Sequence, residues 1–402
     1  MSGVYTSTRG DAKFHAPVAR GRGMTDRVRV WWRELDKWLL GLVLLLMAFG
    51  TVAVAAASPA AGRQYDVGQF VFFQRHIVFQ VLGLGVMLSA SFLSRENARR
   101  IGIMMAVVML FMLLLVPVLG TEVNGAKRWI NVGMSLQPSE FLKPGFAVLL
   151  AWMLSWRLRD SSLPVVAYAT LTMALVGALL MLQPNLGDAI LFGGVWFVLV
   201  TLSGVSFQRI GALIALGVGS LSAAYFLYDN ARHRIDSWIG GGTAFDQVDL
   251  AQRTLLNGGW TGTGLWLGTR KMSLPEAHTD YIFSVIGEEF GLLMCGLVLL
   301  VYLAIIVRVL IRQINEDNLF ALLAGAGLAT QIGGQAFINM LVNLQLFPSK
   351  GMTLPLVSYG GSSTLAVCFT VGLLLAITRR NPFLERDKSG LKDLFAGKED
   401  RA

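Results

Sequence analysis

The chain has 402 residues, of which 54% are hydrophobic and 15% are charged, whereas soluble domains carry roughly 25% charged residues. A water-exposed globular domain is therefore excluded, and continuous apolar stretches of about 20 residues predict an all-α polytopic membrane protein rather than a β-barrel. The net charge of +9 does not indicate nucleic-acid binding, because most Lys and Arg residues stand at the ends of apolar stretches. Cys295 and Cys368 lie within such stretches, which favours small buried side chains over a disulfide.

About ten transmembrane helices are expected. They lie near residues 38–58, 75–93, 101–120, 140–156, 163–183, 187–204, 209–228, 281–307, 319–345 and 351–378. The transmembrane domain 38–378 is thus flanked by a basic, polar tail (1–37) and a C-terminal tail (379–402). The length of the first tail favours a retained first helix over a cleaved signal peptide. An even number of helices puts both tails on one side, and Arg in each loop on that side predicts that both tails are cytoplasmic.

The extracytoplasmic loops also carry cations, which this charge rule does not predict. They include Lys127, Arg128, Arg232, Arg234, Arg253, Arg270, Lys271 and Lys350. Two explanations stay open: long translocated loops tolerate such charges, or the cations bind an anionic substrate. The longest loop, 229–280 before the eighth helix, has too many large apolar residues for disorder, so we expect short interfacial helices broken by glycines. The sequence has no evident internal repeat, which disfavours an inverted-repeat transporter.

The stretch PEAHTDYIFSVIGEEFG (275–291) concentrates ionisable residues at the start of the eighth helix. Glu276, His278 and Asp280 precede the helix, and Glu288 and Glu289 lie about two turns inside it. Intramembrane acids usually face a bundle interior or a water-filled cavity. For Glu288 and Glu289, pairing with Arg or backbone N–H groups is favoured. Asp280 lies at the start of the helix, where it could act as a general base on a hydroxyl or as a helix N-cap, and both roles stay open.

Metal-ligand spacing is not evident around His233 and His278, so no fixed metal site and no tightly bound cofactor are expected. A divalent cation, Mg²⁺ or Mn²⁺, held by one carboxylate such as Asp280 and by a substrate phosphate is compatible with the sequence. Such ions keep most of their water ligands and need few protein ligands.

A second polar cluster occupies residues 124–152. Ser139 is a candidate N-cap for the helix that follows Pro138, and Glu140 stands in the first helical turn, where the helix dipole favours an acid. Lys143 lies at i+3 to Glu140, where the two side chains can pair. A lysine at this depth requires such a partner.

Two further clusters interrupt apolar stretches. In QPNLGDA (183–189), a Pro-Gly break stands beside Gln183. In FPSKGMTLPLVSYGGSSTLAV (347–367), Pro355 and a Gly-Gly pair interrupt a helix near hydroxyl groups. Breaks at membrane depth are tolerated where they are buried or line a cavity. All four clusters map to the extracytoplasmic side, which indicates a site open to the outer leaflet.

Five of these motifs together resemble the SEDS family (shape, elongation, division and sporulation). They are NGAKRWI, QPSEFLKP, QPNLG, EAHTDYIFSVIGEEFG and GMTLPLVSYGGSS, and they occur in the family's order between about residues 40 and 380. The Lys in PSKGMTLPLVSYGGSS and the long basic N-terminus are more similar to the division (FtsW-like) branch than to the elongation (RodA-like) branch. One departure is Asn185 in QPNLG, where many members have Asp.

The resemblance implies a ten-helix peptidoglycan glycosyltransferase of the cytoplasmic (inner) membrane. Such an enzyme polymerises lipid II into β-1,4-linked strands on the outer face of that membrane during septal wall synthesis in cell division. The resemblance maps the essential acid of the HTD motif onto Asp280, as general base on the acceptor 4-hydroxyl with inversion of configuration. It also implies a class B penicillin-binding protein (an FtsI-like transpeptidase) and other divisome membrane proteins as partners. The small residues of 321–336 are a candidate contact surface.

The residues and the resemblance together give the expected substrate-binding set. It comprises Lys127, Arg128, Glu140, Lys143, Gln183, Arg232, Arg234, Glu276, His278, Lys350, Ser358, Tyr359 and Ser362. Three alternatives stay open. A lipid II flippase would use Glu288 and Glu289 as coupling groups, an elongation-type polymerase would share the same chemistry, and a scaffold would recruit the transpeptidase without catalysis.

Overall fold

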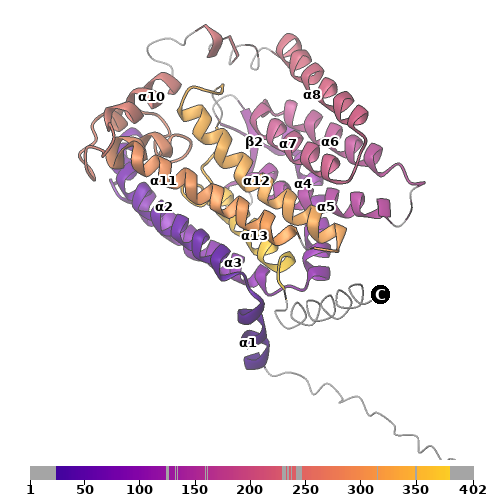
Figure 1. Cartoon of the computed structure of the whole chain (residues 1–402). Helices are drawn as coiled ribbons and strands as arrows, with labels where there is room; N and C mark the ends of the chain where they lie inside the picture. Colours follow the sequence, from indigo (N-terminus) through magenta and orange to yellow (C-terminus); the bar gives the residue numbers. More distant parts are fainter. Residues whose placement is uncertain are drawn as a thin grey trace, which may run out of the picture. The chain divides into compact units, whose positions relative to one another are not determined.

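The structure is a computed structural model, and it describes residues 24–123, 126–131, 133, 135–158, 160, 162–228, 232, 235–236, 238–240, 247–314, 316–348 and 351–380. The chain divides into two compact units. One unit comprises Met1–Leu35 with Arg380–Ala402 and contains helix α1 (Met24–Glu34). The other unit, Asp36–Arg379, holds the remaining elements (Figure 1).

Long apolar helices build the second unit. They are α2 (Lys37–Gln64), α3 (Val71–Ser91), α4 (Arg95–Leu119), α5 (Pro138–Ser155), α6 (Val165–Met181), α7 (Leu186–Leu202), α8 (Phe207–Leu227), α11 (Ile282–Gln313), α12 (Leu319–Asn343) and α13 (Gly361–Ile377). Within the described residues, six of them (α2, α3, α4, α8, α11 and α12) are long and apolar enough to cross a membrane, and α6, α7 and α13 are shorter apolar helices. Each expected transmembrane helix coincides with one of these helices, and the all-α polytopic class is confirmed.

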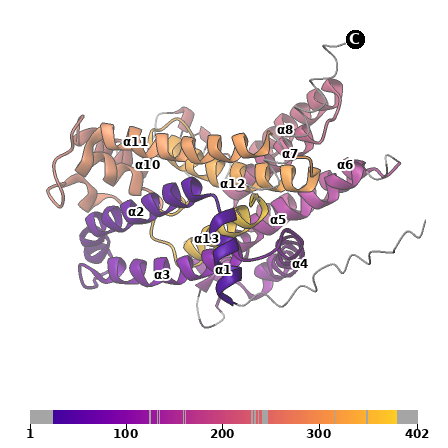
Figure 2. The ribbon, with the colours of Figure 1, turned by 60° about the horizontal axis from the view of Figure 1, so that its bottom comes forward.

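Close helix packing depends on glycines at the contacts. Helix α3 packs along α13, and α4 packs along α5 (Figure 2). A Cβ atom on Gly372 would lie 2.7 Å from the carbonyl oxygen of Met87, and one on Gly145 would lie 2.7 Å from the backbone nitrogen of Ala106. Small residues at these positions let the backbones approach closely, as is common in membrane bundles.

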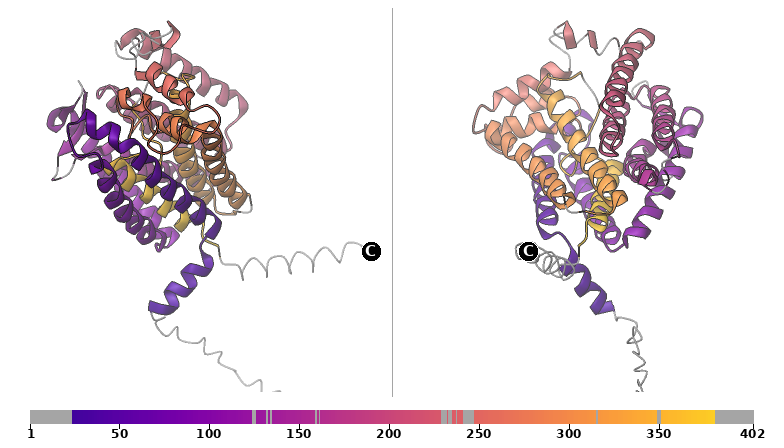
Figure 3. Two further views of the ribbon diagram at one scale, coloured as in Figure 1. Left: turned by 90° about the vertical axis from the view of Figure 1, so that its left-hand side faces the viewer. Right: turned by 45° about the vertical axis from the view of Figure 1, so that its right-hand side comes forward.

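Helix α8 stands at the edge of this unit, beside α7 (Figures 1 and 3). None of its described residues is buried. Helices α5, α12 and α13, in contrast, bury most of their residues and form the centre of the unit.

A small antiparallel sheet follows α4 and was not predicted from the sequence. It consists of β1 (Thr121–Val123), β2 (Ala126–Asn131) and β3 (Ser135–Leu136), in the order β1-β2-β3. The β-branched and aromatic residues of this stretch favour strands. An Asn-Gly pair, typical of two-residue hairpin turns, stands between β1 and β2 in the sequence.

The segment before α13 is not helical, although a helix was expected from residue 351. Pro355 has no N–H to donate within a helix, and Leu356 has a left-handed φ of 66°, which L-residues seldom adopt. Gly50 of α2 packs directly on this segment, since a Cβ there would lie 2.7 Å from the carbonyl oxygen of Leu356. The 351–360 segment therefore runs between helices, with residues 354–358 buried and Gly351 exposed.

The loop before α11 folds tightly onto that helix. It contains α10 (Gln247–Asn257) and a 3₁₀ turn, η2 (Arg270–Ser273). The backbone N–H groups of Thr263 and Gly264 donate to the carbonyls of residues 288 and 289 at 2.9 and 3.0 Å. Helix α11 kinks at Gly291 (φ 82°, ψ 171°), where the carbonyl of Trp260 leaves no room for a side chain. In its described part, the loop has the expected pattern of a short helix followed by glycine turns.

Candidate active site

A cavity of about 1530 Å³ opens at the end of the bundle where α2 ends and α3, α5, α11 and α13 begin. Six of the predicted site residues line it, namely Arg128, Glu140, Glu276, Asp280, Tyr359 and Ser362. They come from segments far apart in the sequence, so the cavity joins the first, second and fourth polar clusters.

The backbone of residues 278–280 is fixed by the segment that precedes α13. The carbonyl of His278 accepts a hydrogen bond from the N–H of Tyr359 at 2.9 Å. The carbonyl of Thr279 accepts one from the hydroxyl of Ser358 at 2.6 Å. Ser358 is buried behind the cavity wall, so its predicted substrate contact is replaced by a structural one.

Two asparagines of α12 complete this support at Asp280. The side-chain amides of Asn339 and Asn343 donate to the Asp280 carbonyl at 2.7 and 3.2 Å. Asn339 also donates to the carbonyl of Met352 at 2.6 Å. The carboxamide oxygen of Asn343 accepts from the backbone and hydroxyl of Ser284 at 3.1 and 2.7 Å. Three consecutive carbonyls before α11 are thus held by donors from α12 and the 351–360 segment.

The side chain of Asp280 is half-buried and faces the cavity. The N-cap of α11 is Tyr281 and has no side-chain cap hydrogen bond, so the N-cap alternative for Asp280 is wrong. Gly351 lies beside its carboxylate, because a Cβ on Gly351 would be 3.1 Å from Oδ2.

Glu276 lies on the cavity wall with a left-handed φ of 52°. Its carboxylate accepts hydrogen bonds from the hydroxyls of Tyr65 at 2.7 Å and Thr279 at 2.8 Å. Burial and the neighbouring Glu276 raise the pKa of Tyr65 well above its usual range, so this tyrosine stays a hydrogen-bond donor at all physiological pH values.

His278 is buried rather than exposed to the cavity. Its ring centroid lies 4.3 Å from that of Phe72 and 5.4 Å from that of Tyr359. Burial lowers the pKa of His278 to about 4, although the nearby Glu276 opposes this shift. The imidazole is therefore neutral at pH 7 and packs as an aromatic group.

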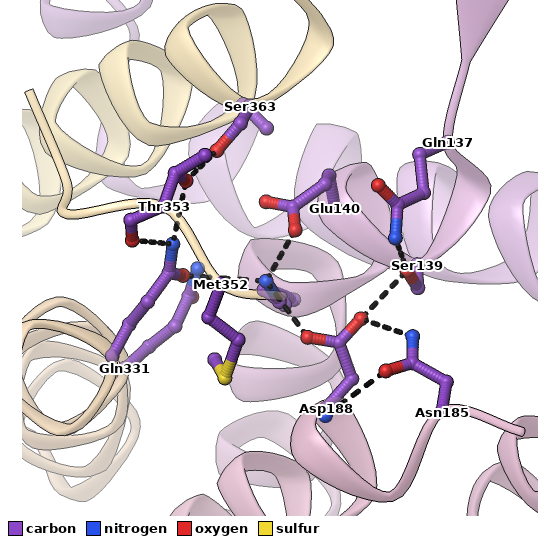
Figure 4. Close-up of polar contacts among 12 residues, drawn as sticks. Gln137, Ser139, Glu140, Asn185, Asp188, Gln331, Met352, Thr353 and Ser363 are labelled. Carbon is purple, nitrogen blue, oxygen red and sulfur yellow. Dashed lines mark hydrogen bonds and ion pairs between the residues drawn. The ribbon is translucent and has the colours of Figure 1, made fainter. Parts of the chain in front are cut away.

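A buried ion cluster lies behind Glu140 (Figure 4). The ammonium of Lys143 lies 2.6 Å from Glu140 and 3.1 Å from Asp188. It also donates to the side-chain oxygen of Gln335 at 3.3 Å, and the amide of Gln335 donates to the carbonyl of Thr353 at 3.0 Å. The expected Glu140–Lys143 pair is present, and its charges link α5 and α7 to α12 and the 351–360 segment.

The Asp188 carboxylate accepts hydrogen bonds from two residues, one in the second cluster and one in the third (Figure 4). The hydroxyl of Ser139 donates to its carboxylate at 2.8 Å, and the amide of Asn185 at 2.7 Å. Helix α5 begins at Pro138 with Gln137 as N-cap. The predicted N-cap role of Ser139 is therefore wrong, because the Asp188 carboxylate takes its hydroxyl.

Arg128 on β2 reaches the third cluster. Its guanidinium donates to the carbonyls of Gln183 at 3.0 Å and Pro184 at 2.5 Å, so it fastens the Pro-Gly break to the cavity wall. The side chain of Gln183 is buried and donates to the carbonyl of Leu113. Lys127 is exposed and does not line the cavity.

The remaining predicted cations do not line this site in the described residues. Arg232 is exposed and pairs with Asp236 at 3.7 Å. Arg234 and Lys350 lie outside the described residues, as does His233.

Sequence reasoning missed several residues of the site. Tyr65, Arg75 and Thr353 line the cavity, and Arg75 carries the same signal as the predicted cations, a charge in an extracytoplasmic loop. Asn339 and Asn343 belong to a run of amides spaced by four residues along α12, which follows Gln331 and Gln335. That spacing puts the four amides on one helix face, and the pattern was available in the sequence.

Glu288 and Glu289 lie outside the cavity and bind the preceding loop. The Glu288 carboxylate accepts from the backbone N–H groups of Arg270 and Lys271 at 2.7 and 2.9 Å, and from the Asn257 amide at 2.9 Å. Glu289 forms a buried ion pair with the ammonium of Lys271. Both acids therefore fasten the loop to α11.

Comparison with known proteins agrees with this architecture. The chain is 35% identical over 363 residues to a probable peptidoglycan glycosyltransferase FtsW of Caulobacter vibrioides, covering 89% of this chain and 93% of the relative. It is 36% identical over 358 residues to the corresponding protein of Halorhodospira halophila, covering 86% and 90%.

Solved structures are also similar to this chain. One, from a study of how a peptidoglycan synthase complex coordinates polymerization and crosslinking, has a TM-score of 0.73 at 30% identity and covers 86% of this chain and 97% of the other. The Thermus thermophilus rod shape determining protein RodA has a TM-score of 0.65 at 28% identity with the same coverage. The profile of the cell cycle protein family of FtsW, RodA and SpoVE matches residues 36–382. The chain therefore belongs to this family, the SEDS proteins.

Proposed function

We propose that this protein is a peptidoglycan glycosyltransferase of the division type, which polymerises lipid II at the septum. In this proposal both termini are cytoplasmic, and the cavity opens to the outer face of the cytoplasmic membrane. The observation that carries the proposal is the arrangement of Asp280. Its carboxylate lines a large cavity, while its own carbonyl and the two before it are held by fixed donors.

In the reaction, the acceptor sugar's 4-hydroxyl attacks the anomeric carbon of the donor. A glycosidic C–O bond forms, the bond to the undecaprenyl pyrophosphate breaks, and Asp280 accepts the hydroxyl proton. A single displacement of an α-linked pyrophosphate gives a β-1,4 bond by inversion, so one base suffices. General-base assistance is worth about 10²–10⁴-fold, and it requires that the carboxylate be held close to the reacting hydroxyl.

The leaving pyrophosphate needs positive charge along the cavity wall. Arg75 and Arg128 both line the cavity, and guanidinium groups match the geometry of phosphate oxygens. Lys127 and Arg232 do not line the cavity, whereas Arg234 and Lys350, outside the described residues, remain contacts proposed from the sequence. Lys143 acts indirectly, since its ammonium holds Glu140 in place on the wall.

A divalent cation fits this scheme as an ion bound mostly by the substrate. Asp280, Glu276 and Glu140 are the carboxylates that line the cavity in the described residues, and Glu140 is already paired with Lys143. In the described residues, no group of three or more His, Cys, Asp or Glu side chains is arranged to hold a metal ion. Mg²⁺ or Mn²⁺ would therefore take its other ligands from phosphate and water, and its role would be to neutralise the leaving group.

The flippase alternative receives no support from the geometry. It requires Glu288 and Glu289 as coupling groups that change their charge or their partners. Instead, three N–H donors hold Glu288 and Lys271 holds Glu289, and neither acid lines the cavity.

A partner transpeptidase completes the proposal. The similar structure at a TM-score of 0.73 comes from a peptidoglycan synthase complex, which supports a class B penicillin-binding protein as partner here. Other divisome membrane proteins are expected to assemble with this pair.

Polymerisation of labelled lipid II by the purified protein with its partner tests the proposal. Wild type should form polymer with Mg²⁺ or Mn²⁺, and Asp280→Asn should fold normally but lose about 10²–10⁴-fold in rate. Asp249→Asn is a matched control, because Asp249 pairs with Arg253 on α10 and does not line the cavity. Polymer from Asp280→Asn at the wild-type rate would remove Asp280 from the chemistry. Absence of polymer from wild type, with lipid II translocation in liposomes, would favour the flippase.

A further inference from the structure

A second cavity, of about 250 Å³, lies at the other end of the bundle. Helix α5 connects the two cavities, since Glu140 in its first turn lines the first one and Trp152, Ser155 and Trp156 at its end line the second. With 18 residues, α5 is about 27 Å long at a rise of about 1.5 Å per residue, close to the thickness of a bilayer core. The remaining walls are the first turn of α4 and the start of α12.

Arginine dominates the charge around this cavity. Arg95 and Arg99 line it, and Arg100 follows on the same helix. Arg95 is held in place by Glu316 at 3.0 Å. Glu96 is shared by Arg99 at 2.7 Å and Arg100 at 2.9 Å. Among the residues that line the cavity, two arginines therefore face one carboxylate, that of Glu96.

Two helix N-termini add to this positive potential. Helix α4 begins after Ser94, whose hydroxyl accepts from the N–H of Asn97 at 3.2 Å, and α12 begins after Asn318, whose side chain accepts from the N–H of Ala321 at 3.2 Å. The N-terminus of each helix carries a partial positive charge. Both starts lie at the same cavity as the arginines.

Aromatic residues set the depth of this cavity in the membrane. Trp152 and Trp156 meet edge to face with ring centroids 5.9 Å apart, and Trp side chains are enriched at the headgroup level of a bilayer. On α4, exposed Met104, Val107 and Phe111 continue the line of Arg100 at helical spacing. An acyl chain lying along this stripe would place its headgroup at Arg100, which shares Glu96 with the cavity-lining Arg99.

We propose that this cavity binds the phosphodiester headgroup of an anionic phospholipid, with the acyl chains outside on α4. A volume of 250 Å³ is below the roughly 300–1,000 Å³ of pockets that enclose drug-sized ligands, so it suits a headgroup and not a whole lipid. Basic pockets between transmembrane helices at a leaflet surface bind such headgroups. This lipid site does not depend on the proposed glycosyl transfer and lies at the opposite end of the bundle from Asp280.

Native mass spectrometry of the full-length protein in detergent tests this site, with dioleoyl phosphatidylglycerol and dioleoyl phosphatidylethanolamine as probes. Wild type should retain the anionic lipid in preference to the zwitterionic one. Arg99→Gln should lower the affinity for phosphatidylglycerol about five-fold, and Ser155→Phe, which fills the cavity but keeps every arginine, should lower it as well. Monodisperse elution and an unchanged polymerisation rate establish that both variants are folded.

Arg209→Gln is the matched control, because Arg209 is an exposed cation in the first turn of another apolar helix, α8, outside the cavity. It should bind phosphatidylglycerol as wild type does. If Arg209→Gln and Arg99→Gln lowered the affinity for phosphatidylglycerol equally, general surface charge would explain the binding and the proposal would be overturned. Normal binding of phosphatidylglycerol by Ser155→Phe would also overturn the proposal. So would an equal rise in melting temperature with millimolar inorganic phosphate and with phosphatidylglycerol, because the site would then be one for free phosphate.

Discussion

Two groups of acids in the stretch 275–291 occupy contrasting surroundings. Glu288 and Glu289 are buried, and the loop before α11 surrounds them with N–H donors and a lysine. Glu276 and Asp280 lie on the wall of the large cavity. At Asp280 the backbone is held, through the carbonyls of residues 278–280, and the Glu276 carboxylate accepts hydrogen bonds from the hydroxyls of Tyr65 and Thr279.

The contrast separates two uses of a carboxylate in a membrane protein. Where fixed donors surround the carboxylate itself, the acid stabilises the fold, as at Glu288 and Glu289. Where fixed donors hold the neighbouring backbone and the carboxylate faces a cavity, the acid is positioned for a substrate, as at Asp280. The residue type and its place near a helix start are similar in both cases, and what differs is whether the acid lines the cavity.

Breaking the buried ion pair should produce the largest change in stability. In Lys271→Met the Glu289 carboxylate loses its counter-ion in a buried setting, which typically costs about 3–5 kcal/mol of unfolding free energy. The apparent melting temperature in detergent should fall strongly, while the polymerisation rate per folded molecule stays near wild type. The double variant Lys271→Met/Glu289→Met should recover most of the loss, because a buried pair is replaceable by apolar groups. A single variant as stable as wild type would mean that the pair does not hold the loop.

Removing a hydrogen-bond donor to the Asp280 carbonyl should lower the catalytic rate rather than the stability. Asn339→Leu deletes the hydrogen bonds to the carbonyls of Asp280 and Met352 and should lower kcat about 10- to 100-fold with little change in KM, because small displacements of a reacting group are costly. Gln331→Leu is the control: Gln331 is a buried amide on the same helix that does not contact residues 278–280. An equal loss of kcat in both variants would make the role of Asn339 a general packing effect.

A smaller effect on the unfolding free energy is expected from pH, through His278. Because burial lowers the pKa of His278 to about 4 from an unfolded value near 6.5, the unfolded chain takes up a proton first as the pH falls. The unfolding free energy should therefore be unaffected above pH 6.5 and decrease by up to about 1.4 kcal/mol per pH unit between pH 6.5 and 4. The melting temperature of His278→Gln should depend less on pH in this window than that of wild type. Parallel curves for the two proteins would show that the pKa of His278 is the same in the folded and the unfolded chain.

The sequence predicted the helices and one ion pair because both depend on local spacing. Continuous apolar stretches give the helices, and i+3 spacing gives Glu140–Lys143. Local patterns failed where a distant residue competes for a side chain. Ser139 is an N-cap candidate from the sequence, but α5 already begins at Pro138 and Asp188 accepts the Ser139 hydroxyl. No spacing in the chain indicates that contact.

The same limit applies to the support of Asp280. The sequence drew attention to the acid, but the donors that hold its backbone come from α12 and the 351–360 segment, about 60 to 80 residues away in the chain. The amide run along α12 carried a usable signal, since four amides at intervals of four residues in an apolar helix require buried partners. The small sheet was missed because its strands are short and lie in a loop between predicted helices.

The most direct test of this account compares Asp280→Asn and Glu288→Gln in one lipid II polymerisation assay, with the amount of folded protein measured by thermal unfolding. The account predicts that Asp280→Asn keeps a melting temperature near wild type but loses about 10²–10⁴-fold in rate. It predicts that Glu288→Gln unfolds at a lower temperature but polymerises at the wild-type rate per folded molecule. The opposite result, an active Asp280→Asn and a stable but inactive Glu288→Gln, would contradict the assignment of the two acids.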